Sequence, residues 1–159
     1  MLLGRVIQSV VGELLLLADE EYLRGVYFEG QDSADWQSGE SEILVQAETE
    51  LQAYFAGELQ NFTVPFTGIG TEFQRQVWEQ LTLIPYGETC SYGDIAKSLG
   101  KPGAMRAVGL ANGRNPISII VPCHRVIGAN KKLVGFGGGL ARKQALLELE
   151  ARGSGKMLL

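Results

Sequence analysis

The residues best suited to chemistry are Cys123 and His124, which stand next to each other in the hexapeptide VPCHRV at positions 121–126. An imidazole can take the thiol proton directly or through one water, and the thiolate is the reactive form of cysteine. The alternative is an inert cysteine buried in a strand. A proline that interrupts an apolar run, a surrounding basic segment and a following glycine-rich loop favour the reactive interpretation. The pair therefore predicts nucleophilic chemistry at the Cys123 sulfur.

The counts of cysteine and histidine narrow this chemistry further. The chain has two cysteines and one histidine. Two cysteines do not make a disulfide scaffold, and both would be free thiols in a reducing compartment. A single histidine cannot complete a Cys2His2 zinc site, and adjacent Cys and His residues lack the spacing of metal ligands. We expect no metal and no other cofactor, and we expect Cys90 to be a structural thiol.

Composition limits the class of protein. A chain of 159 residues with 45% hydrophobic and 20% charged residues can bury a core, which excludes a disordered or fibrous protein. The apolar run Leu14 to Leu17 is far shorter than the roughly 18 residues of a membrane span. Arg5 and Gln8 interrupt the N-terminal apolar stretch, unlike a signal peptide. We expect a soluble cytoplasmic protein with no membrane partner.

Charge is distributed unevenly along the chain. The formal net charge is -4, but residues 95–147 contain nine lysines and arginines and no acidic residue. All 18 acidic residues lie outside this basic segment. Such a segment can attract a polyanion such as nucleic acid, although it can also be a solvated face. The motifs must decide between these two interpretations.

The first third of the chain predicts a small α/β domain. Residues 3–10, 13–18 and 22–28 are typical of three short antiparallel strands. The polar segment 31–39 predicts a loop, residues 42–56 a helix with one apolar stripe, and residues 62–66 a strand or linker. We expect this domain to cover residues 1–66.

The next segment predicts a helix-turn-helix. Thr71 can cap one helix and Ser91 a second helix that stops at Gly100, each with a capping-box partner three residues later. A third helix is expected over 101–113, separated from the second by a tight glycine-containing turn. It would be the recognition helix, and it carries Arg106.

The remaining chain predicts the surroundings of the cysteine. The β-branched run 117–121 and residues 125–127 predict strand on either side of it, followed by a turn at 129–132. A glycine-rich loop at 135–139 would let backbone approach a ligand, and a helix is expected over 140–151. We expect a second domain over 67–152 and a flexible tail over 153–159.

The pentapeptide PCHRV at 122–126 resembles the active-site motif of the O6-alkylguanine-DNA alkyltransferases. The resemblance covers about residues 67–151, and the N-terminal third is similar only in its expected strands and helix. It implies an α/β fold, with a small ribonuclease H-like α/β domain followed by a helical winged helix-turn-helix domain that carries the active site. Further matching segments are 73–83, 85–89, 91–92, 106–109, 112–116, 137–140 and Glu150.

The resemblance implies single-use DNA repair. Such a protein binds double-stranded DNA, flips O6-alkylguanine out of the stack and moves the alkyl group irreversibly to Cys123. O4-alkylthymine stays open as a second substrate. We expect a monomer in solution, and cooperative coating of DNA stays open.

The resemblance also assigns catalytic roles. His124 would be a water-linked base, Glu150 its carboxylate partner, and Tyr92 the donor to the guanine ring as it leaves. Asn115 would brace the active-site turn. Ordinary alternatives are a surface acid for Glu150, a core aromatic for Tyr92 and turn chemistry for Asn115.

Two further groups of residues follow from the resemblance. Arg106 would fill the space of the flipped base, although a phosphate-binding or solvated arginine is the plain alternative. The implied DNA contacts are Tyr92, Arg106, Ala107, Gly109, Arg114 and Arg125. The implied pocket residues are Val126, Gly135, Phe136 and Gly137.

Two departures from the family pattern stand out. Leu110 follows Gly109 where the family usually keeps a small residue, and Gly137 offers only its N-H where some members place a hydroxyl near O6.

Three other functions compete with repair. An alkyltransferase-like protein would bind lesions without repairing them, but such relatives replace the cysteine. A winged-helix regulator would keep Cys123 in its core and read a palindrome as a dimer. A Cys-His hydrolase would turn over and need no DNA.

Overall fold

The computed structural model describes residues 1–31, 33–128, 136 and 138–155. These residues form two compact units, and each is described by itself. The first unit contains Met1–Ile69 and Pro116–Ser118, and the second contains Gly70–Asn115 and the chain from Ile119 onward. The return of 116–118 to the first unit is a long-range feature that the sequence pattern did not indicate.

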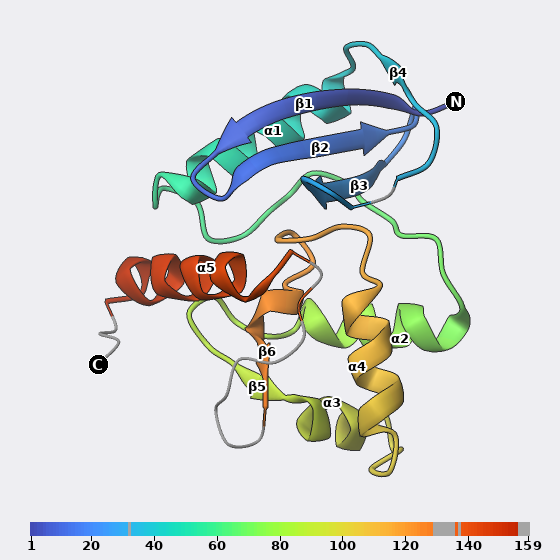
Figure 1. Ribbon diagram of the computed structural model, residues 1–159, viewed down its shortest axis with the longest axis vertical. Helices are drawn as coiled ribbons and strands as arrows, with labels where there is room; N and C mark the ends of the chain where they lie inside the picture. Colours follow the sequence, from blue (N-terminus) through green and yellow to red (C-terminus); the bar gives the residue numbers. More distant parts are fainter. Residues whose placement is uncertain (32, 129–135, 137, 156–159) are drawn as a thin grey trace. The chain divides into compact units, whose positions relative to one another are not determined.

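A four-stranded sheet organises the first unit (Figure 1). Its strands are β1 (Leu3–Ser9), β2 (Gly12–Ala18), β3 (Leu23–Phe28) and β4 (Gln37–Ser38), in the order β3-β2-β1-β4. The pairs β1/β2 and β2/β3 are antiparallel, which confirms the expected meander. The pair β1/β4 is parallel. Strand β4 lies in the segment 31–39 that was expected to be a loop, since a strand of only two residues shows no alternation in the sequence.

Helix α1 (Glu42–Phe55) covers the sheet of this unit. Ser41 caps it by accepting a hydrogen bond from the Leu44 backbone. Its buried stripe repeats at helical spacing, so this face packs on the apolar side chains of the strands. The buried residues of α1 are Leu44, Ala47, Leu51 and Tyr54. The expected strand or linker at 62–66 contributes only an isolated bridge between Leu23 and Phe66.

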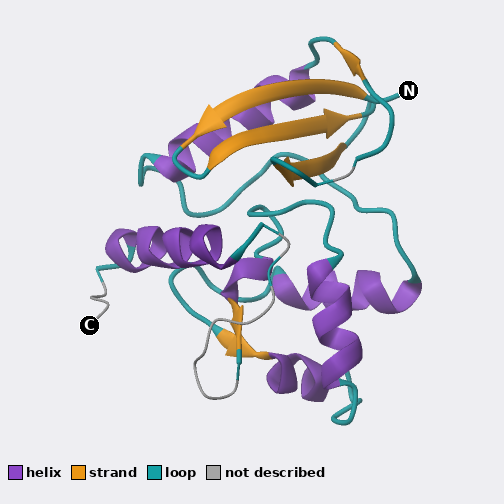
Figure 2. Cartoon of the chain, viewed as in Figure 1, coloured by secondary structure: helices purple, strands orange, loops and turns teal. Residues whose placement is uncertain are grey.

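Short helices dominate the second unit (Figure 2). They are α2 (Glu72–Leu81), α3 (Tyr92–Ser98), α4 (Met105–Gly113) and α5 (Leu140–Gly153), with a 3-10 helix η1 (Cys123–Arg125). Two-residue strands β5 (Cys90–Ser91) and β6 (Val126–Ile127) pair in parallel. Both expected capping boxes form, at Thr71 with Gln74 and at Ser91 with Asp94.

The third expected helix begins later than predicted. Gly100 has a φ of 72°, which ends the preceding helix in a left-handed residue. Residues 101–104 form a turn, and α4 starts only at Met105, with no side-chain cap from Ala104. The predicted start at Lys101 was therefore wrong, because Pro102 and Gly103 prolong the turn.

The expected strand over 117–121 is absent from the described chain. Its residues make isolated bridges instead, among them the one between Ile117 and Val26 in the first unit. Ile119 has a φ of 74°, a left-handed conformation that is strained for a β-branched residue. The backbone therefore turns before Pro122, and η1 follows.

The remaining predictions concern residues 129–159, which the structure describes only in part. The expected turn at 129–132 lies outside the described residues, as do Gly135 and Gly137. Helix α5 extends two residues beyond the predicted end at 151. Of the expected tail, Gly153 belongs to α5 and residues 156–159 lie outside the description. No helix in the described part of the chain is long and apolar enough to cross a membrane.

Candidate active site

Cys123 opens the 3-10 helix η1, and its side chain is buried. Two amide side chains from the end of α4 and the turn after it hold this segment. Asn112 Nδ2 donates to the Cys123 carbonyl at 3.3 Å, and Asn115 Nδ2 donates to the Val121 carbonyl at 2.8 Å. The position of the sulfur is thereby fixed to α4. Asn115 lies where a brace is expected, whereas Asn112 was quoted only as part of a matching segment.

His124 and Glu150 form a buried pair. His124 Nε2 lies 2.6 Å from Glu150 Oε2, and neither side chain is more than 1% exposed. A carboxylate only accepts hydrogen bonds, so Nε2 carries the hydrogen and Nδ1 of a neutral ring holds a free lone pair. Nδ1 is buried and has no hydrogen-bond partner among the described residues. The ring can therefore accept a proton at Nδ1.

Burial sets the charge of this pair. It lowers the pKa of His124. The hydrogen bond and the charge of Glu150 raise that pKa, and the charges of Arg125 and Lys143 lower it. Burial alone would raise the pKa of Glu150, but the contacts with His124 and Arg125 hold it far below its usual range. At neutral pH the arrangement is a neutral imidazole against an ionised carboxylate.

Arg125 belongs to the same buried network and is only 6% exposed. Its Nε donates to Glu150 Oε1 at 2.8 Å, and its NH2 nitrogen donates to Oε2 at 3.0 Å. The predicted DNA contact of this side chain is corrected here, because its guanidinium is occupied inside the unit. The sequence around Arg125 gives no sign that its side chain is buried and not exposed.

Lys143 is a second buried cation that the sequence analysis did not single out. Its exposure is 0%, and it shares the inward face of α5 with Leu146 and Glu150. Burial lowers its pKa, while the charge of Cys123 raises it. The signal available in the sequence was a lysine in an apolar stripe, seven residues before Glu150.

Tyr92 begins α3 and is half-buried. Burial raises the pKa of its phenol, and the charge of Cys123 raises it further. The phenol therefore stays protonated and lies within electrostatic reach of the sulfur. A Cβ on Gly109 would lie 3.9 Å from the Tyr92 ring, so Gly109 of α4 and the Tyr92 ring face each other at ordinary contact distance.

The predicted recognition helix is exposed along one face. Val108, Ala111 and Asn112 are buried, whereas Arg106 and Ala107 are exposed. Arg114, just beyond the helix, is exposed as well. Leu110 is 66% exposed, so α4 presents a large apolar side chain where the family usually has a small one. This face suits contact with a polyanion that also offers apolar surface.

The structure describes only two of the four predicted pocket residues. Val126 is fully buried and Phe136 is half-buried. Gly135 and Gly137 lie outside the described residues. No group of His, Cys, Asp and Glu suited to a metal ion occurs in the described ranges.

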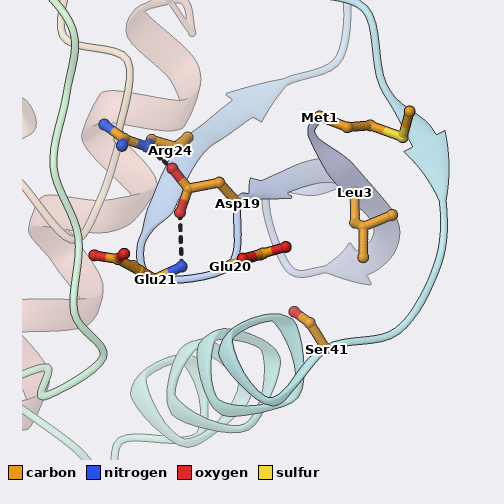
Figure 3. A pocket seen from close by; sticks show the side chains of 7 residues that line it. All are labelled: Met1, Leu3, Asp19, Glu20, Glu21, Arg24 and Ser41. Carbon is orange, nitrogen blue, oxygen red and sulfur yellow. Dashed lines mark hydrogen bonds and ion pairs between the residues drawn. The ribbon is translucent and has the colours of Figure 1, made fainter.

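A hollow of about 560 Å³ lies in the first unit (Figure 3). Its carboxylate Asp19 accepts hydrogen bonds from Arg24 and from the Glu21 backbone, so its charge is already satisfied by the protein. Neither a cysteine nor a histidine is among the described residues that line it. The lining residues are Met1, Leu3, Asp19, Glu20, Glu21, Arg24 and Ser41.

Comparison with known families gives two matches that together cover most of the chain. Residues 72–152 match the DNA binding domain of 6-O-methylguanine DNA methyltransferase. Residues 2–67 match the ribonuclease-like domain of 6-O-methylguanine DNA methyltransferase.

Individual relatives are similar over nearly their whole length. The methylated-DNA–protein-cysteine methyltransferase of Methanosarcina acetivorans is 53% identical over 150 residues, covering 91% of this chain and 96% of the relative. The protein of the same name from Mycobacterium leprae is 52% identical, with 92% and 90% covered. The crystal structure of Mycobacterium tuberculosis OGT in complex with DNA is 52% identical, covers 95% of this chain and 94% of its own, and has a TM-score of 0.90.

Proposed function

Because the chain belongs to the 6-O-methylguanine DNA methyltransferase family, we propose that Cys123 is the sulfur on which its reaction ends. The protein is a DNA-binding alkyltransferase that repairs DNA by moving an alkyl group to one of its own cysteines. The observation that carries the assignment of the residue is the placement of Cys123, buried and braced, directly beside the His124 and Glu150 pair.

The first step is ionisation of the thiol. The Cys123 proton passes to His124 Nδ1, directly or through one water, and Glu150 stabilises the imidazolium that forms. Lys143 adds a buried positive charge within electrostatic reach of the sulfur. Both cations favour the thiolate over the thiol.

The second step is displacement at the alkyl carbon. The thiolate forms a carbon-sulfur bond while the carbon-O6 bond breaks, and the electron pair of that bond stays with the guanine. Tyr92 donates its phenolic hydrogen bond to a ring nitrogen of the guanine, which neutralises the developing charge. The guanine anion takes up one proton, which balances the proton that His124 accepted from the thiol, so the products are S-alkylcysteine and neutral guanine. A thioether is a poor leaving group, so each molecule acts once.

The substrate is double-stranded DNA that contains O6-alkylguanine. The exposed face of α4 enters a groove, and Arg106 fills the space of the extruded base. The acid-free segment 95–147 supplies the phosphate contacts. O4-alkylthymine presents a similar alkyl-oxygen bond and is a second substrate within this proposal.

The protein acts as a monomer that binds one lesion, and neighbouring copies can coat DNA cooperatively. A protein that depends on a free thiol needs a reducing compartment, so we place it in the cytoplasm.

The test is a stoichiometric repair assay on a duplex that carries one O6-methylguanine. The wild type restores one guanine per protein molecule and then stops, and Cys123→Ala restores none while still binding the duplex. Continued turnover would favour a hydrolase, and binding without repair would favour a lesion-recognition protein. Cys90→Ala is the matched control and retains full stoichiometry.

A further inference from the structure

Arg125 makes more buried contacts than a structural salt bridge to one acid needs. It touches both oxygens of Glu150, and its NH1 nitrogen donates to the Ile84 carbonyl at 2.7 Å. Its guanidinium carbon lies 5.7 Å from the centre of the Tyr86 ring. The contacts with Ile84 and Tyr86 therefore help to fix the orientation of the guanidinium, in addition to the carboxylate that it binds.

Glu150 is in turn held from several directions. The Gly87 backbone N-H donates to Oε1 at 3.2 Å, so that oxygen accepts from Gly87 and from Arg125 Nε. Oε2 accepts from Arg125 and from His124 Nε2 at 2.6 Å. The carboxylate cannot rotate away from the imidazole without breaking bonds to the guanidinium.

The imidazole orientation follows from these contacts. His124 donates from Nε2 to a fixed acceptor, which fixes the orientation of the ring. Because Nε2 carries the hydrogen, Nδ1 is the basic atom of the neutral ring. Without the guanidinium, the Glu150 carboxylate would lose two of the hydrogen bonds that hold it, and the imidazole would lose its fixed acceptor.

We infer that Arg125 is a positioning residue of the alkyl transfer, which anchors the Glu150 carboxylate and so keeps His124 neutral and oriented as the base for Cys123. This inference rests on the proposed function. The guanidinium of Arg125 contacts Glu150, Ile84 and Tyr86, so it acts through Glu150.

The groups that face His124 decide how a titration must be interpreted. The charged groups that act on it are Glu150 and Lys143 from α5 and Arg125 from η1. The positive charge of Arg125 lowers the pKa of His124, so its removal must raise that pKa.

Two measurements follow on Arg125→Leu, with Arg75→Leu as the control because Arg75 is exposed on α2. The first is the ring nitrogen NMR spectrum of His124 across pH, which needs no assignment because the chain has one histidine. The second is the reaction rate with free O6-benzylguanine, which avoids effects on DNA binding. We expect the midpoint of His124 protonation to rise by about one pH unit or more, and the rate to fall at least about tenfold.

A double-mutant cycle separates positioning from general damage. In a Glu150→Gln background the carboxylate that Arg125 anchors is already gone, so Arg125→Leu should cost less than about threefold in rate. An equal loss in both backgrounds, or an unchanged His124 spectrum in Arg125→Leu, would overturn the inference.

A further variant covers the case in which Arg125→Leu does not fold. Arg125→Lys keeps the charge but cannot bridge Ile84 and both oxygens of Glu150, so its rate must fall as well. A wild-type rate in Arg125→Lys would contradict the positioning role. If the wild type itself formed no adduct with O6-benzylguanine, the proposed function would fail, while the His124 spectra would still report on Arg125.

Discussion

His124 Nε2 and Glu150 Oε2 lie 2.6 Å apart, and both side chains are buried inside the second unit. The two residues are 26 positions apart in the chain and come from η1 and from α5. The contact leaves Nδ1 as the basic atom of the ring next to Cys123. It also makes the fold sensitive to acid, since both residues must keep their neutral-pH charge states.

The stability of the protein should fall as the pH drops below neutrality. The folded state lowers the pKa of His124 from 6.5 and that of Glu150 from 4.5, so the unfolded chain binds more protons than the folded chain. The His124 contribution is present above about 6.5 and is lost as pH falls below it, and the Glu150 contribution is lost below about 4.5. Urea unfolding from pH 8 to pH 4 measures this slope. His124→Asn should flatten the upper part of the curve; a slope near pH 6 that survives this substitution would contradict the assignment.

Replacing Lys143 should weaken the nucleophile. Lys143→Met removes a buried charge and keeps much of the apolar stem. The thiolate loses a nearby cation, so the rate with O6-benzylguanine should fall about tenfold at pH 7 and recover at higher pH. Rates measured from pH 6 to pH 9 test this, with Lys97→Met as an exposed control on α3. A parallel loss at every pH would mean that Lys143 does not act through the charge of the sulfur.

Removing the phenolic hydroxyl of Tyr92 should slow the chemical step on every substrate. Tyr92→Phe keeps the ring against Gly109 but loses the donor to the leaving guanine, so we expect a loss of about 10²-fold on both free base and duplex. Stopped-flow rates and a separate binding measurement distinguish chemistry from affinity. A loss confined to binding would assign Tyr92 to DNA contact alone.

Arg106 should matter only where a base must leave the stack. Arg106→Ala is expected to slow repair of duplex O6-methylguanine by about tenfold or more while leaving the reaction with free O6-benzylguanine unchanged. Arg106 is exposed on α4, so the variant should fold normally. The two rates are compared in one preparation, with the exposed Arg75→Ala as control; equal losses on both substrates would rule out a role in extrusion.

The sequence predicted those elements whose signals are local. Thr71 and Ser91 stand at capping-box spacing, and both helices begin where the boxes place them. The three strands of the first unit follow from alternation and turn residues, and they were predicted to within one residue or so. The proposed catalytic pair was also visible locally, because Cys123 and His124 are adjacent.

The predictions that failed concern features that depend on tertiary contacts. The β-branched run 117–121 indicated a strand, but its residues divide between the two units and Ile119 adopts a positive φ. Composition cannot show that a chain turns at such a residue. The buried roles of Arg125 and Lys143 were missed for a similar reason: a charged side chain reads as exposed until the partner that neutralises it is known.

The most direct measurement is the mass of the tryptic peptide that spans residues 115–125 after the protein has reacted with one equivalent of O6-benzylguanine. The account predicts one benzyl group, attached to Cys123, with one guanine released per molecule and no further release when more substrate is added. An unmodified peptide, a benzyl group on Cys90, or guanine release that continues beyond one equivalent would contradict it.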